Sequence, residues 1–162
     1  MEKIYNNDPI FELSDVVDFS GVDPRRIHVW IHRGIVTTAH KPEGKGDVRK
    51  YTLCEMVSVR MLARLADEYG LELNAYKGMV KTAAGLVTQF KMEDIGRWVA
   101  GKPHSSEVLS FKDDATLPAV SKDLGSGCFV VLDLLDYFEA LVPAGATLGR
   151  LILLRKQLSR QR

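Results

Sequence analysis

The sequence predicts an α+β fold that is mainly helical. Apolar residues recur three or four positions apart in successive segments between Phe11 and Ala100, which is the spacing of helices with one buried face. Short β-prone runs flank a polar, Gly-containing stretch, and the period changes again after Ser106. A chain of 162 residues with 46% hydrophobic residues is long enough for one domain, or for a small domain with an appendage.

Two short helices are expected near the N-terminus. Apolar residues at helical spacing predict a first helix that begins at Ser14 and ends at Gly21. The second has Asp23 as its N-cap, Pro24 at its first position and Gly34 just past its end. Two short helices joined by a tight, Gly-containing turn are typical of a helix-turn-helix.

The second helix has an apolar side and a basic side. Ile27, Trp30 and Ile31 recur at helical spacing and are expected to face a core. The opposite side carries Arg25, Arg26, His28, Val29, His32 and Arg33. One apolar and one basic side are typical of a recognition helix, which lies in the major groove of DNA, where arginine can pair bidentately with guanine. The alternative is a solvated basic face without a ligand.

A basic hairpin is expected directly after the second helix. The pattern predicts two strands, Ile35–Thr38 and Val48–Tyr51, around a polar, Gly-rich loop. Its cations are expected to contact DNA phosphates, unless the loop is merely solvated; they are Lys41, Lys45, Arg49 and Lys50.

Positive charge is concentrated in this part of the chain. The net charge of the whole chain is only +1. Between Pro24 and Lys50, however, seven Lys and Arg residues stand against two acidic residues, and three of the four histidines lie there too. The sequence therefore predicts a local anion-binding surface.

Three helices and a linker are expected in the middle of the chain. Thr52 and Glu55 form a capping box at the start of the first helix, which ends near Gly70. The second helix spans Leu71 to Phe90 with Asn74 as its cap, and its glycines Gly78 and Gly85 predict close packing by a neighbour. A helix over Met92–Ala100 and a linker over Lys102–Ser106 follow.

The last third of the chain predicts strands followed by helices. The expected strands are Glu107–Phe111 and Cys128–Leu132, and the expected helices are Leu134–Val142 and Thr147–Arg160. A stripe on the last helix is a candidate dimer contact: Leu148, Leu151, Ile152 and Leu158. A two-fold dimer would double the contact of one short helix with DNA. A buried core within the chain, a ligand pocket or a docking site for another protein are the alternatives.

These elements divide the chain into three predicted parts. Residues 1–72 form a winged helix-turn-helix domain, 73–105 connecting helices and a linker, and 106–162 a C-terminal dimerisation or interaction module. No run approaches the roughly 20 apolar residues that span a bilayer, so a cytoplasmic protein with no membrane contact is expected.

Enzymatic and metal-dependent functions are not expected. Cys54 and Cys128 lack a second cysteine at ligand spacing. His28 and His32 have the i, i+4 spacing of two zinc ligands, but no third ligand is evident, so no metal is expected. No nucleophile motif or phosphate-binding glycine loop occurs, so neither catalysis nor a cofactor is expected.

The segment from Phe11 to Leu73 resembles the MerR family of winged-helix transcription regulators. The resemblance rests on Leu13–Val17 before Gly21-Val22, on Pro24-Arg25-Arg26-Ile27, on Gly34-Ile35, and on Arg49-Lys50-Tyr51-Thr52 at the opening of a helix. It implies a winged helix, promoter binding and a dimer. The chain departs from the family at His28 and Val29, where an arginine and an aromatic residue are common, and at Gly101–Ser106, which interrupts the usual long dimerisation helix.

The sequence as a whole predicts a homodimeric regulator that binds double-stranded DNA at an inverted repeat. Repression and activation fit equally well, and a compact regulator without an evident sensor domain also fits a phage or prophage repressor or excision factor. A protein-interaction adaptor on a winged-helix scaffold is the alternative from another class. A third possibility is an architectural or excisionase-like binder that reads DNA shape.

Overall fold

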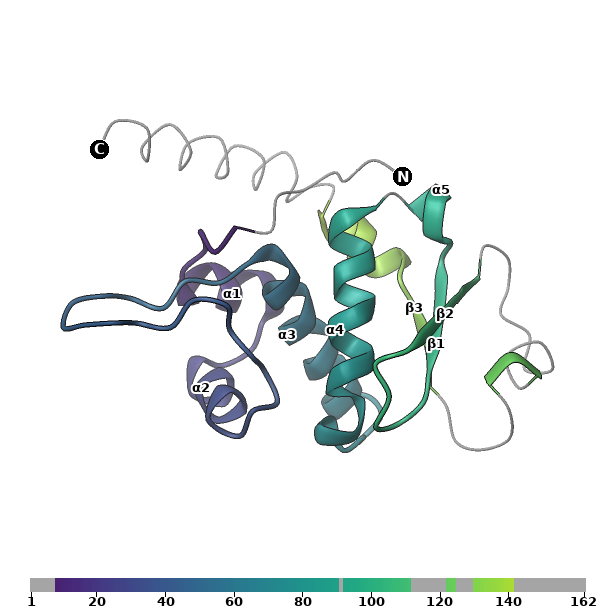
Figure 1. Cartoon of the computed structure of the whole chain (residues 1–162), viewed down its shortest axis with the longest axis horizontal. Helices are drawn as coiled ribbons and strands as arrows, with labels where there is room; N and C mark the ends of the chain where they lie inside the picture. Colours follow the sequence, from purple (N-terminus) through teal and green to yellow (C-terminus); the bar gives the residue numbers. More distant parts are fainter. Residues whose placement is uncertain (1–7, 91, 112–121, 125–129, 142–162) are drawn as a thin grey trace.

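The computed structural model describes residues 8–90, 92–111, 122–124 and 130–141 (Figure 1). The fold is α+β and mainly helical, as the sequence predicts. Its elements are α1 (Leu13–Ser20), α2 (Pro24–His32), α3 (Leu53–Asp67), α4 (Leu73–Gln89), α5 (Met92–Ile95), β1 (Trp98–Gly101), β2 (Val108–Phe111) and β3 (Val130–Asp133).

The helices α3 and α4 form the centre of the molecule. Side chains from all around α3 are buried, including Met56, Val57, Met61 and Leu65. Figure 1 shows α1 and α2 on one side of the α3–α4 pair and the sheet on the other. One hydrophobic cluster runs through the described residues from Phe11 to Leu141.

The two N-terminal helices have the predicted order. Gly21 and Gly34 both take the left-handed conformation, with φ of 70° and 65°, just past the helix ends. The expected start of α1 at Ser14 is wrong, because Glu12 is the N-cap and its N–H donates to Asp15 Oδ2 at 2.7 Å. At α2 the prediction is confirmed, since Asp23 Oδ1 accepts from the backbone N–H of Arg25 at 2.8 Å.

The start of α3 is as predicted and the start of α4 is not. The hydroxyl of Thr52 accepts from Glu55 N at 3.1 Å, and Glu55 Oε2 accepts from Thr52 N at 2.9 Å. The N-cap of α4 is Glu72, and no side chain caps it. Asn74 already lies inside the first turn, so its predicted capping role is wrong.

The strands form a three-stranded antiparallel sheet with the order β2-β1-β3. The expected helix over Met92–Ala100 is wrong beyond Ile95. Gly96, at φ of 95°, ends α5, and β1 then pairs with a strand on each side. The predicted strand Glu107–Phe111 corresponds to β2. Of the predicted strand Cys128–Leu132, residues 130–132 lie in β3 and residues 128–129 lie outside the described residues; β1 separates the two strands in the sheet.

The expected linker at Lys102–Ser106 is instead the connection between β1 and β2. It packs on α4, where Thr82 Oγ1 donates to the carbonyl of Ser106 at 2.7 Å. A Cβ on Gly78 would lie 2.6 Å from Ser106 Oγ and 3.1 Å from the carbonyl oxygen of Ser105. The predicted close packing is therefore confirmed at Gly78. A Cβ on Gly85 would meet only Gln89 Nε2, at an ordinary contact distance of 4.0 Å.

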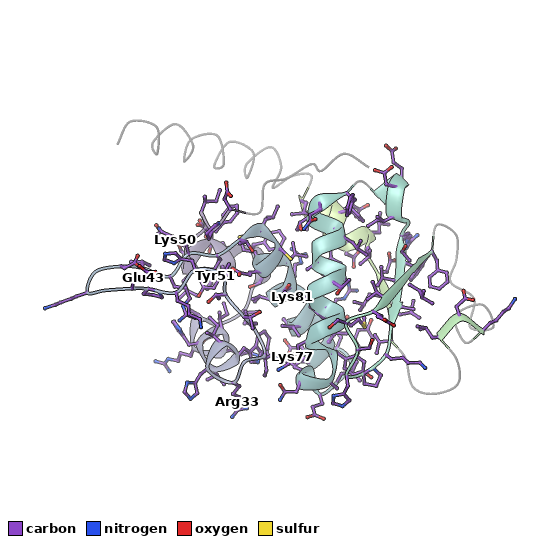
Figure 2. All side chains as sticks on the ribbon, in the orientation of Figure 1. Arg33, Glu43, Lys50, Tyr51, Lys77 and Lys81 are labelled. Atoms are coloured by element: carbon purple, nitrogen blue, oxygen red, sulfur yellow. The ribbon has the colours of Figure 1, made fainter. Side chains whose placement is uncertain are left out.

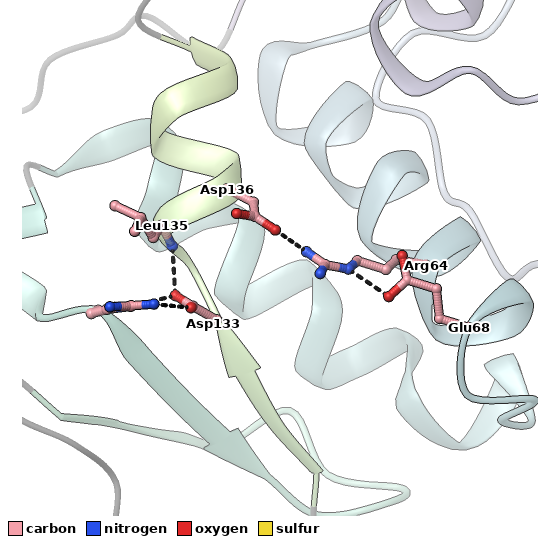
Figure 3. Close-up of polar contacts among 6 residues, drawn as sticks. Arg64, Glu68, Asp133, Leu135 and Asp136 are labelled. Carbon is pink, nitrogen blue, oxygen red and sulfur yellow. Dashed lines mark hydrogen bonds and ion pairs between the residues drawn. The ribbon is translucent and has the colours of Figure 1, made fainter.

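Residues 135–141 are helical, as expected after β3. Figure 3 shows how this helix is attached: Asp136 pairs with Arg64 of α3, and Asp133 accepts from the N–H of Leu135 at 3.0 Å. Asp133 also pairs with Arg97, whose guanidinium lowers the pKa of that carboxyl group. The predicted helix over Thr147–Arg160, with Leu148, Leu151, Ile152 and Leu158, lies outside the described residues.

Among the helices described, none is both long and apolar enough to cross a bilayer. Within the same residues, no group of three or more His, Cys, Asp or Glu side chains is arranged to hold a metal ion.

The two glycines of α4 lead to opposite predictions for alanine. Gly85→Ala should raise the free energy of unfolding by about 0.5–1 kcal/mol, because alanine restricts the unfolded chain and its methyl group clashes with no neighbour. Gly78→Ala should lower it by about 1 kcal/mol or more, because the new methyl group displaces the β1–β2 connection. Urea denaturation measures both. Equal stabilisation by the two variants would contradict the described packing.

Candidate nucleic-acid interface

The helix α2 buries its apolar side and exposes its basic side. Ile27 is 0% and Trp30 5% exposed, so both lie in the core as the sequence predicts. The exposed side chains are those of Arg25, His28, Val29, His32 and Arg33. Val29 is 44% exposed, which leaves an apolar side chain on an otherwise polar surface.

Arg26 differs from the other predicted contact residues on α2. Its guanidinium donates to both carboxylate oxygens of Asp67, at 2.9 and 2.7 Å, and lies 4.7 Å from the centre of the Trp30 ring. This hydrogen bonding lowers the pKa of Asp67 and raises the pKa of Arg26. Because the Asp67 side chain is 57% exposed, the pair adds less than about 1 kcal/mol of stability. Its effect is to fix α2 against the end of α3.

The two strands predicted at Ile35–Thr38 and Val48–Tyr51 do not form. The segment between α2 and α3 is a projecting loop with two arms, which we call the 36–50 loop (Figure 1). Side chains join the arms instead of a backbone ladder. Arg49 Nη1 donates to Thr38 Oγ1 at 3.2 Å, and Lys50 N donates to His40 Nδ1 at 3.1 Å.

The base of the 36–50 loop is anchored to the start of α1 and to the start of α3. Tyr51 forms an isolated β-bridge with Phe11 and is 1% exposed, so the chain is fixed just before α3. Lys50 Nζ donates to Glu12 Oε1 at 2.7 Å. Glu55 Oε1 accepts from the N–H of Ala39 at 2.6 Å, in addition to the capping bond of its other oxygen. This second role of Glu55 was not evident from the sequence.

The predicted cations therefore fall into two groups. Arg26, Arg49 and Lys50 are engaged in bonds within the protein. The others are exposed, and their charged groups form no hydrogen bond or ion pair with the described residues: Arg25, Arg33, Lys41 and Lys45. The second group is available to bind an external anion.

Two further lysines lie close to this surface and were not predicted to belong to it. Lys77 and Lys81 are exposed residues on α4, and Figure 2 shows them on the side of α4 that faces α2. Lys77 Nζ donates to the carbonyl of Gly34 at 3.0 Å, which adds a bond to the end of α2. Their i, i+4 spacing places them on one helix face, but nothing in the sequence indicates which element that face meets.

Comparison with known proteins does not assign the chain to a family. The sequence matches no model of a known protein family, and no curated protein matches it.

The buried carboxyl group of Glu55 predicts a specific pH dependence. Burial raises its pKa above the ordinary value of a glutamate, against the opposing effect of its hydrogen bonds. As pH rises from the ordinary pKa of the unfolded chain through the raised pKa of the folded protein, the unfolded chain loses the proton first, so the folded state is destabilised. The free energy of unfolding of the wild type should therefore fall relative to that of Glu55→Gln.

Urea denaturation of both proteins across this pH interval tests the effect. If the difference in the free energy of unfolding between the two proteins does not change with pH, burial does not raise the pKa of Glu55 as assigned. If the wild type instead becomes more stable than Glu55→Gln as pH rises, the N–H donors and Lys81 stabilise the carboxylate more than burial destabilises it.

Proposed function

We propose that this protein is a sequence-specific transcription regulator that binds double-stranded DNA. The observation that carries the proposal is the exposed basic face of α2 beside a projecting basic loop. In the proposed complex α2 enters the major groove and the 36–50 loop follows the phosphate backbone. The resemblance of this part of the sequence to the MerR family supports the same arrangement.

The two groups of cations have different roles in this proposal. Arg25 and Arg33 contact base edges or phosphates, and Lys41 and Lys45 contact phosphates. The engaged cations of α2 and the loop act as positioning residues, because their bonds hold the helix and the loop in place. Val29 fits a thymine methyl group, which is the apolar feature of the major groove.

A homodimer on an inverted repeat completes the proposal. The helix α2 has nine residues, so one copy reaches few base pairs. A two-fold dimer presents two such helices to half-sites about one turn of DNA apart. The candidate contact is the C-terminal stripe predicted from the sequence.

Selection from genomic DNA tests the proposed function. Purified protein is mixed with random genomic fragments at two salt concentrations, and the retained fragments are sequenced. We expect enrichment of an inverted repeat and an affinity that falls steeply with salt. Retention without a shared sequence would favour a shape-reading binder. No retention at low salt would refute DNA binding and favour an adaptor.

Charge variants localise the contact. Arg25→Glu should weaken binding to the selected DNA about tenfold or more, because it replaces a favourable contact by repulsion. The double variant Lys41→Ala, Lys45→Ala should reduce the slope of log affinity against log salt by about two. Lys122→Glu is the matched control, since Lys122 is exposed but lies outside the interface. Equal losses for Arg25→Glu and the control would contradict the assigned surface.

A further inference from the structure

A cavity of about 560 Å³ lies next to the candidate interface. Three segments line it: the segment 34–39 that follows α2, residues 52–62 at the start and middle of α3, and the side of α4 that carries Lys77 and Lys81. Its volume falls in the range of pockets that hold small molecules, about 300–1,000 Å³. The DNA-binding proposal makes no use of this cavity.

The interior of the cavity is mainly apolar. Val36, Val80 and Leu62 are buried core residues that also line it, and Leu62 has an exposure of 1%. An apolar surface of this kind favours the hydrocarbon part of a ligand, because binding removes that part from water. The few polar groups then determine which end of a ligand lies where.

The charged groups of the cavity favour an anion. Among the described residues that line it, Glu55 supplies the carboxylate, and both of its oxygens already accept backbone N–H groups. Lys77 donates to the carbonyl of Gly34. The ammonium group of Lys81 makes no hydrogen bond with the described residues, although its charge acts on Glu55. Lys81, labelled on α4 in Figure 2, therefore offers to the cavity a donor that has no hydrogen-bond partner among the described residues.

We propose that this cavity binds a small molecule with an apolar body and a single carboxylate group. The carboxylate pairs with Lys81 at the mouth, and the apolar body lies against Leu62, Val36 and Val80. A neutral molecule with the same body would leave the ammonium group without a partner. The site does not depend on the proposed function, although it shares the segment 34–39 with the candidate interface.

A titration of the full chain without DNA tests this site. The probe is decanoate, added below the concentration at which it forms micelles, and decanol is the neutral molecule of the same length. Backbone amide signals are followed by NMR. We expect saturable shifts at the residues around the cavity with decanoate, and binding of decanol weaker by about tenfold or more, because the ion pair is lost.

Two variants test separately how the charge of Lys81 and the volume of the cavity contribute to decanoate binding. Lys81→Glu should weaken decanoate binding by about tenfold or more, whereas the exposed control Lys122→Glu should leave it unchanged. Ser58→Phe should fill the cavity and abolish binding with the lysine intact, since Ser58 lines it. The amide spectrum of each variant shows whether it is folded.

Three results would overturn the proposal: no saturable shifts around the cavity, equal binding of decanol and decanoate, or full decanoate binding by Lys81→Glu. Since DNA is absent, these results are independent of whether the protein binds DNA.

Discussion

The burial of α3 is the constraint on which the rest of the structure depends. Its eight buried residues extend around the helix, so it needs partners on more than one side. The helix α4 supplies one partner, and α1, Ile27 and Trp30 belong to the same hydrophobic cluster. The sheet in turn packs behind α4. The basic surface therefore lies on α2, and the apolar contacts of its buried side hold this helix in place.

Polar contacts then set the details of that surface. The Arg26–Asp67 pair fixes one end of α2, and Lys77 bonds to the carbonyl that follows its other end. Glu55 joins the start of α3 to the 36–50 loop through its two oxygens. Charges with internal partners thus position the surface, and its exposed cations without partners among the described residues are those that the proposed function assigns to DNA. The cavity beside Lys81 lies on the same framework.

Local signals in the sequence predicted what local interactions determine. The caps at Asp23 and Thr52 depend on residues two or three positions away, and both were predicted. Two other local predictions were wrong, because Glu12 and Glu72, rather than Ser14 and Asn74, are the N-caps of α1 and α4. The remaining failures involve distant partners. Trp98–Ala100 was predicted to be helical, but these residues form a strand because β2 and β3 supply its hydrogen bonds. Asp67 lies 41 residues from Arg26. The predicted basic face was found, but its division into engaged and free cations required the tertiary structure.

Amide hydrogen exchange with and without a bound DNA duplex is the most direct test of the central claim, that the face of α2 and the 36–50 loop form one DNA-binding surface. The account predicts slower exchange on binding in residues 25–33 and 39–50, with little change in β1, β2 and β3. Unchanged exchange in those two segments, or protection confined to the sheet, would contradict it.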